Sequence, residues 1–486
     1  MQSHSYLCAL RIRLLLPALA AGAFLVVAPD RAPAQEYGEP RYGGGNPTQS
    51  APRKAAPPRK TVKPAHETPA ARAAGKSNKS GGKADAKADT KSDTKSDTPR
   101  RISAAPAAGE RRFVANEVVI EVAGRPSPEQ VDALARRHGL TRQESQSFDL
   151  TGTTMFRWAI PEGRSVNAVI RELEADGTVL SAQPNYRYTL QQNPGPDNSE
   201  GLQYAVDKLQ LTKAHGLALG DRILIAVIDS GIDKSHPELK GQIADSFDPV
   251  GAGKPHLHGT GIAGVIAADM RLTGVAPRAR ILAVRAFDPS GGTAEGTTFN
   301  ILKGLEWSVT KGARVINMSF AGPQDPALSR SLAAAHKKGV VLIAAAGNSG
   351  VKSPPLFPAA DPNVIAVTAT DAADQLFAPS NRGNHVAVAA PGVDLLLPSP
   401  GKGYQMASGT SFAAAHVSGV AALVLARDPK LSPDSVRRVL LSTAKDLGPK
   451  GRDKDYGAGL ADAYQALVSL GRTPADGLSA SATSNR

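Results

Sequence analysis

The chain alternates two hydrophobic patterns from residue 202 onward. Short runs of consecutive apolar residues predict buried parallel strands, whereas apolar residues that recur every three or four positions predict helices. The apolar runs lie at 223–228, 281–284, 340–346, 364–367 and 386–389, and 315–318 is strand-like with Asn317 as its polar residue. The helical pattern falls at 297–311, 327–338, 411–427 and 432–444. This alternation predicts an α/β fold over 202–470 with a doubly wound, mainly parallel sheet.

A smaller unit precedes this domain at 113–190. Its mainly apolar segments predict strands at 118–122, 155–160 and 179–188, and a further strand is predicted near 143–148. Two helices lie between them, because Ser127 and Ser165 are suitable N-caps and each is followed by apolar residues at helical spacing. The resulting βαββαβ order predicts a small α+β domain of the ferredoxin-like type.

Residues 1–34 have the pattern of a secretory signal peptide. Arginines precede an apolar stretch at 14–28, and a small-residue segment follows it. The stretch is shorter than the ~20 residues of a spanning helix, so we expect a secreted or periplasmic product with no integral membrane segment. An uncleaved anchor is the alternative. The only cysteine, Cys8, lies here, so we expect no disulfide in the exported chain.

Residues 35–112 are poor in large apolar side chains and predict a disordered spacer. Within it, 83–98 repeats a four-residue unit of lysine, small residue, aspartate and small residue. Because the two charges balance, the repeat indicates a solvated spacer and argues against a nucleic-acid partner, although the whole chain carries +13. Residues 471–486 are small and polar and predict a flexible tail.

Ser411 stands where a small-residue turn opens into an apolar helix. The free backbone N–H groups at a helix start can stabilise an oxyanion formed beside the serine. A serine hydroxyl is a weak nucleophile, so it needs a base and a group that orients the base. The candidates are Asp229, which ends the apolar run at 223–228, and His258, which begins a small-residue helix. Their order along the chain is Asp, His, Ser.

These three motifs in this order resemble the subtilisin-like serine proteases, or subtilases, over about 202–470. The resemblance implies that Asp229, His258 and Ser411 form a catalytic triad. It also implies that Asn348, in Gly347-Asn348-Ser349-Gly350 after an apolar run, donates to the oxyanion. Singly, each of the four has an ordinary structural interpretation, as a cap, a packed histidine or a turn residue.

The resemblance also assigns a substrate cleft, whose backbone would pair with an extended peptide. The residues that it implies are Ser319, Phe320, Ala321, Gly322, Ala346 and Gly347. It implies no cofactor and no catalytic metal. Many subtilases have a calcium-binding loop after the histidine helix, but the short connection at 269–274 has one carboxylate, so we expect no calcium there.

Two positions depart from the usual subtilase pattern. Gly261 stands where a second histidine is common, and Ala415 stands where proline is common. Neither removes a triad member, but Ala415 leaves open the balance between hydrolysis and acyl transfer to amines.

By the same resemblance, 113–190 is similar to a propeptide that folds the enzyme and inhibits it until it is removed. The alternative is a permanent accessory domain. We expect self-cleavage between residues 188 and 201. The whole chain is therefore interpreted as a monomeric, self-processing serine endopeptidase whose partners are a protein or peptide substrate and its own propeptide. The alternatives are a peptide ligase or esterase on the same scaffold, and a non-enzymatic binding or chaperone protein.

Overall fold

The computed structural model describes residues 104–191, 193–194, 203–251, 253–289 and 294–471. The predicted signal peptide, most of the predicted spacer and nearly all of the predicted tail lie outside these ranges. The last part of the predicted spacer, 104–112, is described. There, the Ala104 N–H donates to Glu174 Oε1 at 2.8 Å.

The N-terminal domain has the predicted βαββαβ order. Its elements are β1 (Phe113–Ala123), α1 (Pro128–His138), β2 (Thr141–Phe148), β3 (Thr153–Ala159), α2 (Val166–Glu174) and β4 (Ser181–Leu190). The strand order β2-β3-β1-β4, with antiparallel pairing throughout, is that of a ferredoxin-like sheet. Strand β4 begins two residues later than predicted and continues to Leu190.

Local capping explains where the two helices of this domain begin. Ser127 Oγ accepts from the Gln130 N–H, and the Gln130 side chain accepts from the Ser127 N–H, which completes a capping box. Gly139 ends α1 at φ 61°, a left-handed conformation that favours glycine. Ser165 caps α2 in the same way by accepting from the Ala168 N–H.

The larger domain contains the predicted parallel sheet. Its order is β15 (Val386–Pro391), β14 (Val364–Thr370), β13 (Val341–Ala345), β11 (Val315–Met318), β6 (Leu224–Asp229), β8 (Arg280–Arg285) and β7 (Ile243–Phe247). Every neighbouring pair is parallel. The chain builds outward from β6 in both directions, which confirms a doubly wound fold and places a topological switch point between β6 and β11.

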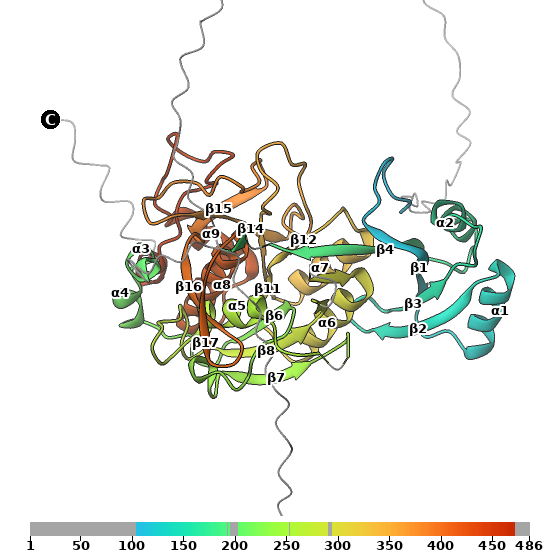
Figure 1. The fold of residues 1–486 in the computed structure, drawn as a ribbon, viewed down its shortest axis with the longest axis horizontal. Coiled ribbons are helices and arrows are strands. Elements are labelled where there is room, and N and C mark those ends of the chain that lie inside the picture. The colour runs from blue at the N-terminus through green and yellow to red at the C-terminus, as the bar shows by residue number, and fades with distance from the viewer. Residues whose placement is uncertain (1–103, 192, 195–202, 252, 290–293, 472–486) are drawn as a thin grey trace, which may run out of the picture. The chain divides into compact units, whose positions relative to one another are not determined.

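Helices cover both faces of this sheet (Figure 1). One face packs against α5 (Leu257–Ala267) and α8 (Thr410–Arg427), and the other against α6 (Thr298–Thr310) and α7 (Pro326–Lys337). Within β6, Ile225 and Val227 belong to the first core, while Ala226 and Ile228 belong to the second. A strand that is apolar on both faces is therefore the consequence of burial between two helical layers.

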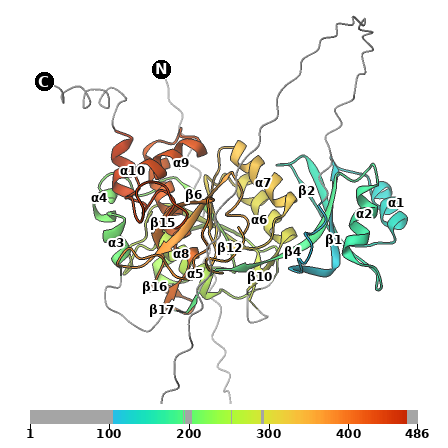
Figure 2. The same ribbon diagram turned by 90° about the horizontal axis from the view of Figure 1, so that it is seen from above.

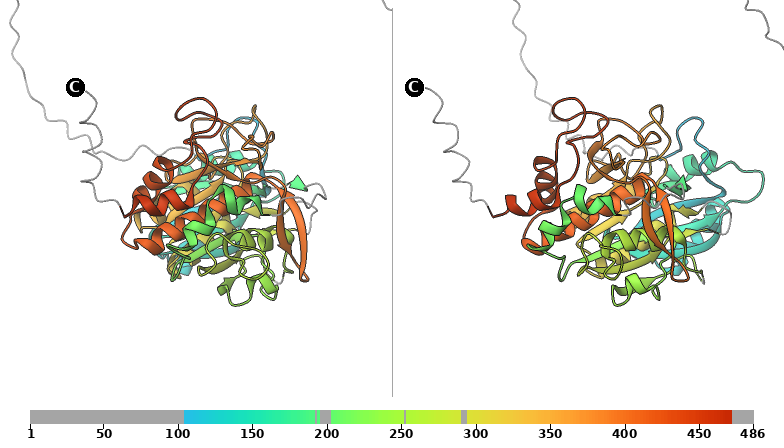
Figure 3. Two further views of the ribbon diagram at one scale, coloured as in Figure 1. Left: turned by 90° about the vertical axis from the view of Figure 1, so that its left-hand side faces the viewer. Right: turned by 60° about the vertical axis from the view of Figure 1, so that its left-hand side comes forward.

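Shorter elements complete the larger domain. They are α3 (Tyr204–Lys208), α4 (Leu211–His215), η1 (Pro237–Leu239), β5 (Asn193–Pro194), β9 (Phe287–Asp288), β10 (Glu295–Thr297), β12 (Phe320–Ala321), β16 (Leu395–Ser399), β17 (Gly403–Ser408), α9 (Pro433–Ser442) and α10 (Ala463–Ser469). Figure 3 shows the green α3 and α4 beside the red C-terminal helices. The Ala463 N–H donates to the Leu209 carbonyl there, at 3.1 Å.

The four-stranded N-terminal sheet has two apolar faces. Val118, Ile120 and Trp158 pack with α1 and α2 into a core of their own. Val119 and Met155, which point the other way, belong to the same core as the residues of α6 and α7. Figure 2 shows the sheet between these two helix pairs.

One helix in the described part of the chain, α8, is long and apolar enough to cross a membrane. Of its 18-residue apolar window, 89% is buried inside the protein, which is the position of a core helix.

Candidate active site

The predicted aspartate and histidine meet at the carboxyl end of β6. His258 Nδ1 lies 2.7 Å from Asp229 Oδ1 and 2.9 Å from Oδ2, and neither side chain is exposed. Asp229 Oδ1 also accepts from the backbone N–H of Ser230 at 2.7 Å and from its hydroxyl at 3.0 Å. The carboxylate is thus fixed, and it holds the imidazole with Nε2 directed away from β6.

The free nitrogen of His258 faces the start of α8. The imidazole lies 5.8 Å from the Phe412 ring, centroid to centroid, and Nε2 is buried with no hydrogen-bond partner among the described residues. The Ser411 hydroxyl donates instead to the Ser319 carbonyl at 3.0 Å. The structure therefore forms the Asp–His contact, but the Ser411 hydroxyl points to Ser319.

Asn348 is held through its carbonyl oxygen. Oδ1 accepts from the Thr410 hydroxyl at 2.8 Å and from the Thr410 N–H at 3.2 Å. Nδ2 is consequently directed the other way, and it is buried without a partner in the described part of the chain. Thr410, which sequence reasoning missed, orients this amide; only its place before Ser411 could have drawn attention to it.

Residues 189–191, at the end of the N-terminal domain, lie in the predicted cleft. Strand β4 pairs antiparallel with β12, with Thr189 opposite Ala321 and Leu190 opposite Phe320. The Gln191 N–H then donates to the Ser319 carbonyl at 3.3 Å, the same oxygen that accepts from the Ser411 hydroxyl. The Gln191 backbone therefore lies beside Ser411.

The segment continues past the start of α8. The Asn348 N–H donates to the Gln191 side-chain oxygen at 2.9 Å. Asn193 and Pro194, which form β5, pair antiparallel with Ser408 and Ala407 of β17. Residues on both sides of Ser411 thus bind one extended segment by main-chain pairing, which is how a cleft binds a peptide as an added strand.

The six predicted cleft residues divide into two groups. Ser319, Phe320 and Ala321 pair with the segment, and Gly322 faces Tyr188, since a Cβ there would lie 2.3 Å from its ring. Ala346 and Gly347 are neighbours of Asn348, but their hydrogen bonds go to residues of their own domain, namely Val367, Asn381 and Thr410.

Comparisons with known proteins identify the family of both domains. Residues 220–459 match the Subtilase family, and 99–185 match the Fervidolysin N-terminal prodomain. The thermophilic serine proteinase of Bacillus sp. (strain AK1) is 32% identical over 370 residues, which cover 74% of this chain and 90% of the relative. Subtilisin E of Bacillus subtilis (strain 168) is 35% identical over 314 residues, or 62% and 81% of the two chains. The chain belongs to the subtilase family.

A solved structure extends the likeness to both domains of this subtilase. Fervidolysin from Fervidobacterium pennivorans, a keratinolytic enzyme related to subtilisin, matches with a TM-score of 0.65 at 26% identity. The match covers 75% of this chain and 63%, or less than two thirds, of fervidolysin. The chain is therefore a subtilase serine endopeptidase with an N-terminal prodomain.

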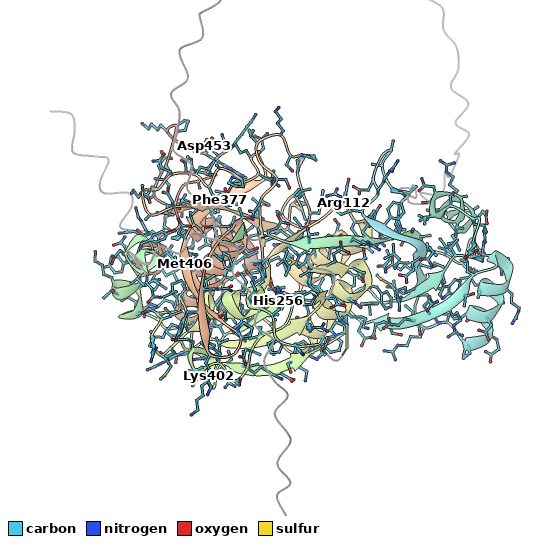
Figure 4. The ribbon with its side chains drawn as sticks, viewed as in Figure 1. Arg112, His256, Phe377, Lys402, Met406 and Asp453 are labelled. Carbon is cyan, nitrogen blue, oxygen red and sulfur yellow. The ribbon has the colours of Figure 1, made fainter. Side chains whose placement is uncertain are left out.

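A second histidine lies beside the aspartate of this subtilase. His256, labelled in Figure 4, is the N-cap of α5, and its Nδ1 lies 2.9 Å from the Ser230 hydroxyl. Burial lowers the pKa of His256 below 6.5, although the Asp229 charge opposes this. The neutral ring therefore predominates at neutral pH. Asp233, the other nearby acid, binds the Ser235 N–H and hydroxyl and the Gly401 N–H as a turn residue.

The two departures from the family pattern lie in packed surroundings. A Cβ on Gly261 would lie 3.3 Å from Leu397 and 3.5 Å from Phe412. Ala415 is fully buried on α8. His416 is almost fully buried on the same helix, and its Nδ1 lies 2.9 Å from the Phe412 carbonyl. Neither departure displaces Asp229 from His258.

The loop after α5 does not fit a calcium ion. The buried Glu238 carboxylate accepts from the backbone N–H groups of Met270, Arg271 and Leu272 at 3.0–3.2 Å and from the Tyr404 hydroxyl at 2.6 Å. Calcium needs oxygen ligands, whereas this loop presents N–H donors that already occupy the carboxylate. Among the described residues, no three His, Cys, Asp or Glu side chains gather in a group that could hold a metal.

Proposed function

We propose that this subtilase hydrolyses peptide bonds with Asp229, His258 and Ser411 as its triad and Asn348 as an oxyanion donor. The observation that carries the proposal is a pair of buried atoms, His258 Nε2 as an acceptor and Asn348 Nδ2 as a donor, that have no hydrogen-bond partner among the described residues. Buried polar atoms normally have partners, so orphaned ones require an explanation. A reacting serine and a developing oxyanion are the two partners that these atoms would find during catalysis.

The steps follow from the geometry. The Ser411 hydroxyl turns from the Ser319 carbonyl to His258 Nε2, gives up its proton and attacks the peptide carbonyl carbon. Asp229 holds the imidazole and stabilises its positive charge. Asn348 Nδ2 and the Ser411 N–H donate to the oxyanion that this attack forms. The oxyanion then collapses and the C–N bond breaks while the imidazolium protonates the leaving amine, and water hydrolyses the acyl-enzyme by the same proton transfers.

We also propose that the chain processes itself at the bond after Gln191. Thr189, Leu190 and Gln191 pair with one side of the cleft, and Asn193 pairs with the other. Because the Gln191 N–H and the Ser411 hydroxyl donate to the same Ser319 carbonyl, the Gln191 carbonyl carbon is the proposed point of attack. Main-chain pairing on both sides holds the segment as a substrate is held, so the prodomain would act as both inhibitor and first substrate.

The mature enzyme is proposed to be secreted or periplasmic and monomeric. The signal pattern at 1–34 supports export. One relative, 33% identical, is named the minor extracellular protease Epr of Bacillus subtilis (strain 168). Casein and other unfolded proteins are the expected class of substrate.

Mass spectrometry of purified full-length chains tests the proposal. The wild-type chain should be cleaved after Gln191 and should degrade casein. Ser411→Ala should remain intact and inactive, because loss of the nucleophile typically costs about 10⁶-fold in turnover. Ser418→Ala is the matched control, since it removes another buried hydroxyl from α8 and should still process. Processing of purified Ser411→Ala would contradict self-cleavage, and intact casein with wild type would contradict the peptidase.

A further inference from the structure

The pocket that holds Tyr188 has aromatic walls. Tyr188 is fully buried and packs edge-on against Phe320, with ring centroids 5.7 Å apart. Phe320 in turn contacts Phe287 at 5.0 Å. Gly322 makes the space for the ring, because a Cβ there would lie 2.3 Å from Tyr188 Cδ1. The pocket therefore fits a planar ring.

A carboxylate lies at the end of this pocket. Asp325 is 1% exposed, and its Oδ2 accepts from the Tyr188 hydroxyl at 2.9 Å and the Thr298 hydroxyl at 2.6 Å. Its Oδ1 accepts from the Gln183 side chain at 2.7 Å and the Leu328 N–H at 3.0 Å. Each oxygen thus has one donor from the peptidase domain and one from the prodomain.

Removal of the prodomain takes away half of these donors. Thr298 and the Leu328 N–H stay with Asp325, while Tyr188 and Gln183 leave. A buried acceptor that lacks a donor is unfavourable, and a charged acceptor more so. A phenylalanine ring would fill the aromatic walls but leave Oδ2 without its second donor. A tyrosine ring would fill the same walls and also donate its hydroxyl hydrogen to Oδ2.

We propose that Asp325 is a specificity-determining residue that selects tyrosine as the fourth residue before the cleaved bond. Tyr188 stands in that position relative to the bond after Gln191, so the inference rests on the proposed function. The pocket would then recognise substrate proteins by the contact that docks the prodomain.

The phenol remains a donor over the working pH range. Burial raises the pKa of Tyr188 well above 10, and the nearby Asp325 charge raises it further. A tyrosine hydroxyl in this pocket therefore stays protonated at neutral and mildly alkaline pH. A donor is what the vacated position on Oδ2 requires.

Two peptides that differ by one oxygen atom test the selectivity. Both contain the chain's own Tyr-Thr-Leu-Gln-Gln-Asn segment, one with tyrosine and one with phenylalanine at the first position. The processed wild-type enzyme should cleave the tyrosine peptide with a kcat/KM at least about tenfold higher. Equal values would overturn the inference, as would failure to cleave either peptide while casein is degraded. Loss of casein cleavage as well would overturn the proposed function itself.

Asp325→Asn identifies the residue responsible. Asparagine keeps the N-cap of α7 but removes the charge, so the ratio between the two peptides should fall below about threefold. An unchanged ratio would overturn the role of Asp325.

A second pair of variants covers the case in which Asp325→Asn fails to mature. In an otherwise wild-type chain, Tyr188→Phe should yield a processed prodomain that inhibits the peptidase domain about tenfold less. The measurement is the fraction of the peptidase that becomes active when the processed sample is diluted. Tyr186→Phe is the matched control, because this buried tyrosine lies on the same strand and its hydroxyl has no hydrogen bond to Asp325. Equal inhibition by both variants would overturn the inference.

Discussion

At the residue scale, buried histidines of this subtilase differ in whether their polar atoms are paired. His258 Nε2, proposed above to act in catalysis, is buried without a partner in the described structure, as is Asn348 Nδ2. His416 is likewise buried, but its Nδ1 meets the Phe412 carbonyl at 2.9 Å. Its pairing within α8 makes His416 a structural residue, so protonation of its ring should lower the stability of the fold.

His416 should destabilise the fold as the pH falls. Burial lowers the pKa of His416 from 6.5 to about 4, although the carbonyls of Phe412 and Pro391 partly oppose this. Because the unfolded chain takes up the proton first, stability present above pH 6.5 is lost progressively down to about pH 4. The full loss is about 3 kcal/mol.

Denaturant unfolding at several pH values checks this prediction. Ser411→Ala serves as the background, because it prevents self-digestion. His416→Asn retains a donor near the Phe412 carbonyl but cannot titrate in this range, so its free energy of unfolding should fall less between pH 6.5 and pH 4. Parallel pH profiles for the two proteins would show that another group is responsible.

At the element scale, the strands buried between two helical layers were predictable. Most positions of such a strand are apolar, as at 315–318, where only Asn317 is polar, and the pattern needs no knowledge of its neighbours. The edge strand β7 and the hairpin of β16 and β17 were missed. Their sequences are polar or interrupted by Pro398, and only pairing with the rest of the domain makes them strands.

In the candidate site, too, features with a local sequence pattern were predictable, and contacts between distant residues were not. Asp229, His258, Asn348 and Ser411 each stand at a strand end or helix start, so local patterns and a family resemblance located them. The contact between Tyr188 and Asp325 joins residues 137 positions apart. Asp325 is the N-cap of α7, and no local pattern could reveal that it also binds Tyr188.

Glu238 should stabilise the loop after α5 without calcium. Its carboxylate satisfies three backbone N–H groups of 270–272 and the Tyr404 hydroxyl. Glu238→Ala would leave these donors unpaired in a buried place and should lower the free energy of unfolding by about 3 kcal/mol. Glu238→Gln, which keeps one acceptor oxygen, should cost less.

Thermal unfolding with and without a calcium chelator separates this interpretation from a metal site. In the Ser411→Ala background, Tm should be the same in both conditions. A large fall in Tm with chelator, abolished in Glu238→Ala, would mean that the carboxylate binds an ion.

At the scale of the whole molecule, the prodomain binds by a continuous sheet edge and a buried polar cluster. Strand β4 pairs with β10 and β12 of the peptidase domain. Lys303 with Glu144 and Arg330 with Glu121 are charged contacts between the domains, and in each pair one side chain is 33% or 41% exposed. Solvent weakens an ion pair with an exposed partner, so the fully buried cluster around Asp325 should dominate the affinity. Cleavage after Gln191 removes none of these contacts.

The processed chain should therefore remain inhibited until its prodomain dissociates or is degraded. Cleavage seen by mass spectrometry should precede casein hydrolysis, with a lag during which the two fragments co-elute. Gln183→Ala should shorten this lag, because it removes two hydrogen bonds across the interface, to Asp325 at 2.7 Å and from the Ala327 N–H at 3.0 Å. The expected weakening of prodomain binding is about 10- to 100-fold.

Gln146→Ala provides the control for this last experiment. Gln146 is an exposed residue of β2, and among the described residues its side chain donates only to the neighbouring Ser147 carbonyl. Its lag should equal that of wild type. If Gln183→Ala shows the wild-type lag as well, the buried cluster does not govern release, and the sheet pairing of β4 must hold the prodomain by itself. Casein hydrolysis that begins with cleavage, without any lag, would instead show that cutting the chain is sufficient to open the cleft.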